Sequence, residues 1–184
     1  MRLRSFRVAT LLGIPVLVSP SWFVLFAVSM WFLATQFYPA AMAEGSQGTH
    51  YLMAAASVAG FFVSIVLHEL AHSVVAKWFR IPVKSITLFV FGGVAQVTRE
   101  AARPLQELLM AAAGPLTSLA LGGLCFGAWA LLGARADRAL DYVLVWLGLM
   151  NLVLGVFNLL PAFPMDGGRV FRSLVWLATG NHGL

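Results

Sequence analysis

The chain has few charged residues. Only 10% of its 184 residues carry charge, twelve Lys and Arg against seven Asp and Glu, whereas soluble domains average about 25%. So few charges cannot cover the surface of a water-soluble globule of this size or keep a chain disordered. The basic residues, set in so apolar a chain, are better explained as signals of membrane topology than as a nucleic-acid-binding surface. The composition therefore excludes an ordinary soluble enzyme, a disordered chain and a nucleic-acid-binding protein.

Cysteine is almost absent. Cys125 is the single cysteine of the chain, and it lies within an apolar run. One cysteine cannot form an internal disulfide framework or a cysteine-based metal cluster. Any metal site in this chain must therefore be built from histidine and carboxylate side chains.

Long apolar runs are what the chain has instead, with 60% hydrophobic residues and a mean hydropathy of +0.87. The runs cover residues 20–37, 52–79, 105–132 and 142–160. Each approaches or exceeds the ~20 residues that cross about 30 Å of hydrocarbon. We therefore predict an all-α polytopic membrane protein, a single domain over residues 1–184 with about four core transmembrane helices.

Two further segments do not have the character of spans. Residues 9–19 and 82–98 are rich in Val, Ile, Thr and Phe, contain Pro or Gly, and partly alternate in polarity. This pattern predicts short strands or hairpins at the membrane surface. Because unpaired backbone cannot face lipid, the two segments should pair with each other or lie in the interface.

The distribution of basic residues predicts the orientation. If the N-terminus is cytoplasmic, ten Lys and Arg fall on the cytoplasmic side and only Arg135 and Arg138 fall on the other, while residues 38–51 contain none. This agrees with the positive-inside rule. We expect a multi-pass protein of the cell membrane, with both termini and the strand segments at the cytoplasmic face.

Ionisable residues inside the spans are rare, and three of them stand together. His68, Glu69 and His72 form the pattern H-E-x-x-H in the second span. Residues four apart share one face of a helix, so both imidazoles can bind one Zn²⁺. Glu69 lies about 100° around the helix, where it can activate a water as general base. The alternative is a pair of hydrogen-bonded histidines in a helix bundle.

A catalytic zinc site needs a third protein ligand. The histidines and acids that could supply it are His50, His182, Glu44, Glu100, Glu107, Asp137, Asp141 and Asp166. Loop and tail positions favour solvated surface residues for His50, Glu44 and His182. A solvated helix end is the favoured reading of Glu107.

Asp166 differs from the other candidates because it follows a break in a helix. Pro161 and Pro164 must unwind the end of the fourth span, and Gly167 and Gly168 permit a sharp backbone after it, with a helix starting near Arg169. A carboxylate on irregular backbone at membrane depth is costly unless it meets a cation; the alternative is a solvated Asp in a loop after the helix. The second and fourth spans both run inward, so Asp166 and the histidines should meet towards the cytoplasmic side.

The chain resembles the site-2 protease family of intramembrane zinc metalloproteases. The resemblance rests on His68-Glu-Leu-Ala-His72 and on N-x-x-P-x-x-P-x-D-G from Asn158 to Gly167, with further likeness at PSWF (20–23), FGGVAQ (91–96) and AGP (113–115). It implies a protease with one Zn²⁺ held by His68, His72 and Asp166, and with Glu69 as the base.

The resemblance also implies a substrate site. Asn158 would position the substrate or stabilise an oxyanion, although it could instead brace the unwound helix. Residues Gly92, Gly93, Val94 and Ala95 would pair with an unwound substrate by strand addition, with Pro161 and Pro164 nearby; a purely structural hairpin is the alternative. The implied partner is a single-pass membrane protein, such as an anti-sigma or pro-sigma factor, in the lipid bilayer.

Many bacterial relatives of this kind continue with further helices and a regulatory domain, which we expect this chain to lack. The composition is compatible with an oligomer. Two rival functions remain at this point, a membrane metal transporter and a zinc-stabilised scaffold. The outer halves of the spans offer almost no ionisable relay for transport, and a scaffold has no need for Glu69 beside His68.

Overall fold

The computed structural model describes residues 5–90, 92–133 and 138–180. The helical elements are α1 (Pro20–Phe32), a π-helical turn η1 (Leu33–Phe37), α2 (Tyr38–Ala41), α3 (Gln47–Trp78), α4 (Pro104–Leu131), α5 (Ala139–Asn158) and α6 (Asp166–Thr179). The strands are β1 (Phe6–Leu11), β2 (Ile14–Val18), β3 (Val83–Phe89) and β4 (Gly92–Val97).

Four helical segments are long and apolar enough to cross a membrane, Pro20–Ala41, Gln47–Trp78, Pro104–Leu131 and Ala139–Asn158. The predicted fold class is confirmed, and the chain is a membrane protein. The helices extend further into residues 38–51 than the polar composition of that segment suggested. The Ser46 side chain accepts a hydrogen bond from the Thr49 N–H at 3.2 Å, which caps α3 and starts it at Gln47.

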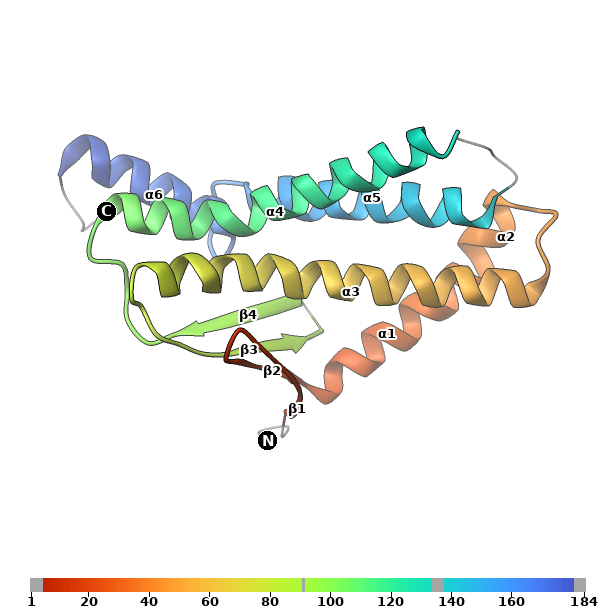
Figure 1. Cartoon of the computed structure of the whole chain (residues 1–184), viewed down its shortest axis with the longest axis horizontal. Coiled ribbons are helices and arrows are strands. Elements are labelled where there is room, and N and C mark those ends of the chain that lie inside the picture. The colour runs from red at the N-terminus through yellow and green to blue at the C-terminus, as the bar shows by residue number, and fades with distance from the viewer. Residues whose placement is uncertain (1–4, 91, 134–137, 181–184) are drawn as a thin grey trace.

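The long helix α3 lies at the centre of the molecule. In Figure 1 it runs between a layer formed by α4 and α5 and a second layer formed by the sheet and α1. Its first half contributes buried apolar side chains to the core, among them Ala54, Val58 and Phe62. Its second half carries the H-E-x-x-H pattern, and both histidines are buried.

The strands form one sheet in the order β1-β2-β3-β4. The middle pair, β2 and β3, is parallel, with Val16 opposite Ile86, and the two outer pairs are antiparallel hairpins. This confirms the expectation that the two strand-like segments pair with each other. Edge strand β4 contacts α3, which places one free sheet edge beside the histidine pair.

The chain turns sharply between α5 and α6. Pro161 and Pro164 follow the end of α5, and α6 begins at Asp166, three residues before the expected start at Arg169. Asp166 therefore lies in the first turn of a helix, where its charge is favourable. Gly167 does not adopt a positive φ, and a Cβ there would overlap the carbonyl groups of Leu159 and Leu160, so glycine is needed at this break for the close approach of two backbone segments.

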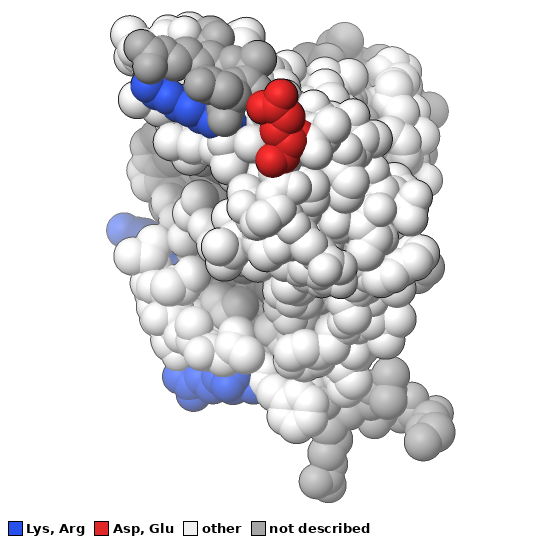
Figure 2. Space-filling view, turned by 90° about the vertical axis from the view of Figure 1, so that its right-hand side faces the viewer, with Lys and Arg blue, Asp and Glu red and all other residues white. Residues whose placement is uncertain are grey.

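Basic residues gather at the end of the molecule that carries the sheet. The described Lys and Arg residues of β1, β3 and α6 lie at that end, as do those near the end of α3 and the start of α4. Among the described residues, only Arg138 lies at the other end. Figure 2 views the end opposite the sheet and shows a surface that is mostly uncharged. Arg2, Arg4 and Arg135, which also entered the charge count, lie outside the described residues.

Candidate metal centre and active site

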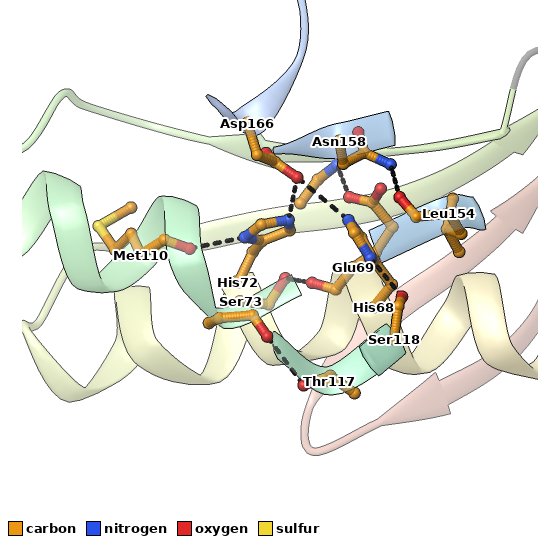
Figure 3. A network of polar contacts seen from close by, with 12 residues as sticks. His68, Glu69, His72, Ser73, Met110, Thr117, Ser118, Leu154, Asn158 and Asp166 are labelled. Atoms are coloured by element: carbon orange, nitrogen blue, oxygen red, sulfur yellow. Dashed lines mark hydrogen bonds and ion pairs between the residues drawn. The ribbon is translucent and has the colours of Figure 1, made fainter. Parts of the chain in front are cut away.

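Three predicted ligands converge in the structure. His68 and His72 lie one turn apart on α3, with their ring centroids 4.9 Å apart, and both are buried. Asp166 approaches them from the start of α6, and its Oδ2 atom lies 3.1 Å from Nε2 of each histidine (Figure 3). Two elements distant in sequence therefore bring three donor atoms to one point.

Each imidazole is held by its other nitrogen. Nδ1 of His68 lies 2.9 Å from Ser118 Oγ, and Nδ1 of His72 donates to the Met110 carbonyl at 2.6 Å. A carbonyl oxygen can only accept, so Nδ1 of His72 carries the proton and Nε2 of the neutral ring keeps its lone pair. That lone pair faces the Asp166 carboxylate, which is also an acceptor. A cation between them removes this conflict.

The donor set fits zinc. One ligand atom from each of His68, His72 and Asp166 lies within 4.8 Å of the other two, and ligand atoms about 2.1 Å from a tetrahedral centre lie about 3.4 Å apart. Imidazole nitrogens and a carboxylate oxygen are ligand atoms that Zn²⁺ takes in proteins.

A glycine on α4 makes room for the histidine pair. A Cβ on Gly114 would overlap both imidazoles, with His68 Nε2 only 2.6 Å away. Met110, Gly114 and Ser118 are spaced four residues apart, so they form one face of α4 against α3. Gly114 and Ser118 belong to the stretch 111–123, whose small residues predict a close approach of helices but give no sign that they contact the histidines. The second layer of the site therefore comes from α4.

Glu69 lies between the histidines and the edge of the sheet. Its Oε2 accepts a hydrogen bond from the Ala95 N–H at 3.1 Å. The Thr98 N–H bonds to the Pro82 carbonyl on the β3 side, and backbone groups alternate in direction along a strand. Gly93, Ala95 and Val97 therefore direct their N–H and C=O groups away from β3, and the Ala95 N–H reaches Glu69.

A cavity of about 190 Å³ joins these groups. It is lined by Glu69, His72, Asp166, Asn158, Pro164, Met110, Arg169 and the β4 residues Gly93, Val94, Ala95 and Val97. Gly92 and Pro161, which were expected at the substrate site, are not among the lining residues. The Asn158 side chain lines the cavity and donates to the Leu154 carbonyl at 2.9 Å. It thus reaches the site while bracing the last turn of α5.

The other candidate ligands lie apart from this cluster. His50 was expected at the surface but is buried, and its Nε2 lies 3.0 Å from the Met42 carbonyl. Glu107 was expected as a solvated helix end but is buried and paired with Arg172, which raises the pKa of that guanidinium. Glu44 and Glu100 are exposed and Asp141 is buried near the start of α5; Asp137 and His182 lie outside the described residues.

Comparison with known proteins assigns the chain to a family. The sequence model of peptidase family M50 matches residues 56–134 and 127–183, a region that contains His68, His72 and Asp166. The chain belongs to peptidase family M50. The solved structure of a site-2 protease from Methanocaldococcus jannaschii matches with a TM-score of 0.64 and 32% identity over 96% of this chain and 74% of that one. These matches confirm the predicted resemblance to the site-2 protease family.

Two relatives carry zinc in their names. A Synechocystis protein named "Putative zinc metalloprotease sll0528" is 40% identical over 96% of this chain and 46% of its own length. Zinc metalloprotease MJ0392 of Methanocaldococcus jannaschii is 42% identical over 62% of this chain and 32% of its own length. The chain thus spans less than half the length of these relatives.

Proposed function

We propose that this chain forms the core of a zinc-dependent intramembrane endopeptidase. It hydrolyses a peptide bond within or next to a transmembrane segment of a membrane-tethered protein. The observation that carries the proposal is the meeting of His68, His72 and Asp166 beside a cavity that is lined by Glu69 and by the edge strand β4. In this assignment the first three residues bind one Zn²⁺.

The chemistry needs a Lewis acid and a base in one cavity. When bound, zinc polarises the scissile carbonyl and makes water nucleophilic at neutral pH. Glu69 is placed to accept a proton from that water and to return it to the leaving amine. Asn158 lines the same cavity, and its amide can donate a hydrogen bond to the oxygen of the reacting carbonyl.

The substrate must be unwound to be cleaved, because a helical carbonyl is shielded and already hydrogen-bonded. The outward backbone groups of Gly93, Ala95 and Val97 offer an edge on which an extended substrate can add as a strand. Val94 alternates with them, and both Val94 and Pro164 line the cavity. Strand addition at β4 would hold the scissile bond beside Glu69.

The orientation follows from charge. The concentration of basic residues at the sheet end supports a cell-membrane protein with that end, both termini and the active site on the cytoplasmic side. Cleavage there would release a tethered cytoplasmic factor, for which an anti-sigma or pro-sigma protein is a suitable class. This is regulated intramembrane proteolysis.

The test compares wild type with Glu69→Gln, both purified in detergent and loaded with zinc. The probe is a labelled 25-residue apolar peptide with a Gly-Pro pair in one half, reconstituted in liposomes, with its products identified by mass spectrometry. We expect cleavage by wild type and a loss of about 10²–10⁴-fold in Glu69→Gln, with one zinc per chain retained in both.

Glu44→Gln is the matched control, because it makes the same acid-to-amide change at an exposed position away from the site. It should cleave as wild type does. Retained activity in Glu69→Gln would exclude this residue as the base. Zinc-loaded wild type that leaves the peptide intact would favour a scaffold function.

A further inference from the structure

Glu107 is a buried carboxylate outside the proposed ligand set. Its side chain is only 3% exposed, in the first turn of α4, and its Oε1 atom accepts a hydrogen bond from Arg172 Nε at 3.1 Å. Arg172 Nη2 also contacts this oxygen, and Arg169 Nε lies 3.7 Å from it. Residues 169 and 172 share one face of α6. One acid on α4 thus holds two bases on α6, an arrangement called here the Glu107 clamp.

The clamp acts on the helix that carries Asp166. Asp166 is the first residue of α6, and Arg172 lies six residues later, about 9 Å along the axis. Helix α6 packs against α4 and runs beside its first turns in Figure 1. The other face of α6 presents exposed Phe171, Leu174 and Leu177. The position of Asp166 therefore depends on how α6 is fixed to α4.

Helix α4 also fixes the histidines, through Met110 and Ser118. Glu107, Met110, Gly114 and Ser118 all lie within three turns of that helix. One rigid element thus contacts both imidazoles directly and the carboxylate ligand through α6. Metal sites tolerate only about 0.5 Å of misplacement in their ligands. A shift of α6 along α4 would therefore move Asp166 and weaken metal binding.

We propose that Glu107 is a positioning residue of the metal centre, which sets the place of Asp166 through Arg172 and Arg169. The inference rests on the proposed function in one respect, that Asp166 binds zinc. A buried carboxylate that loses its partners must find water or new partners. Loss of the clamp should therefore let α6 move and weaken metal binding, without removing any ligand.

The experiment measures the zinc dissociation constant by chelator competition on the full chain in detergent. Glu107→Gln should raise that constant at least tenfold, and Arg172→Gln should do the same. The double variant should bind zinc no more weakly than Glu107→Gln alone, because that single change already removes the contacts of Glu107 with both arginines. Glu100→Gln is the matched control, since it removes the same charge from a nearby exposed acid, and it should stay within twofold of wild type.

A second readout separates positioning from general stability. In Co²⁺-loaded protein, the visible ligand-field absorption reports the geometry of the ligands, and Glu107→Gln should change it while Glu100→Gln should not. A lower melting temperature of Glu107→Gln with unchanged zinc affinity and spectrum would overturn the proposal. If Glu107→Gln does not fold, Arg172→Gln decides by the same criteria.

Asp166→Ala separates the two hypotheses. If it binds zinc as wild type does, the proposed ligand set fails, and the positioning proposal fails with it. If Asp166→Ala weakens zinc binding while the folded clamp variants do not, only the positioning proposal fails.

Discussion

The two halves of the candidate metal centre are built differently. The histidines come from the middle of the bundle, on a long helix packed on two sides, and each imidazole has a second partner on α4. The carboxylate comes from a short helix beyond a broken segment, and its side chain is more exposed, at 16% against 4% and 11% for the histidines. The histidine half depends on packing within the core, and the aspartate half depends on how α6 is anchored.

The largest effect is expected from a substitution that displaces the two histidines directly. Gly114→Ala would place a methyl group against both imidazoles, so we expect the zinc dissociation constant to rise at least 100-fold, about 2.7 kcal/mol. Gly123→Ala is the control on the same helix, because a Cβ there meets nothing within 4 Å. Equal zinc affinity in the two variants would show that the histidines do not need this space.

A smaller effect is expected from removing one orienting hydrogen bond. Ser118→Ala leaves Nδ1 of His68 without its partner, and loss of such a partner weakens metal binding by about 10- to 100-fold. Thr117→Val is the control, since Thr117 bonds only to the Ala113 carbonyl of its own helix among the described residues. Chelator competition on both variants measures the difference, and an unchanged Ser118→Ala would mean that packing alone orients His68.

The smallest effect on zinc binding is expected from a buried histidine outside the site. His50 is a buried histidine that bonds to the Met42 carbonyl, so His50→Ala should cost about 1 kcal/mol and lower the melting temperature by about 2–4 °C. Its zinc dissociation constant should stay within twofold of wild type. A large loss of zinc in this variant would mean that the metal lies elsewhere.

The sequence predicted the parts of the fold that depend on local pattern. Apolar run length located the four spans, and residue composition located the strands, because bilayer thickness and backbone pairing leave few alternatives. The helical spacing of His68 and His72 predicted a shared face. Proline at 161 and 164 predicted the break before Asp166.

Tertiary contacts were harder to predict. The burial of Glu107 was missed because its partner Arg172 lies 65 residues away, and charge near a helix end usually indicates solvent. The close approach of Gly167 to the carbonyl groups of Leu159 and Leu160 was not predicted, because a glycine at a close backbone contact has the same local sequence pattern as a glycine in a tight turn. The orienting partners Ser118 and Met110 depend on how α4 packs on α3, which no local pattern fixes.

The most direct test of the account is the metal content of the purified chain, wild type beside Asp166→Ala and Gly123→Ala, after zinc is supplied and excess removed. The account predicts one zinc per chain in wild type and in Gly123→Ala, and little or none in Asp166→Ala. A full zinc complement in Asp166→Ala, or none in wild type, would contradict it.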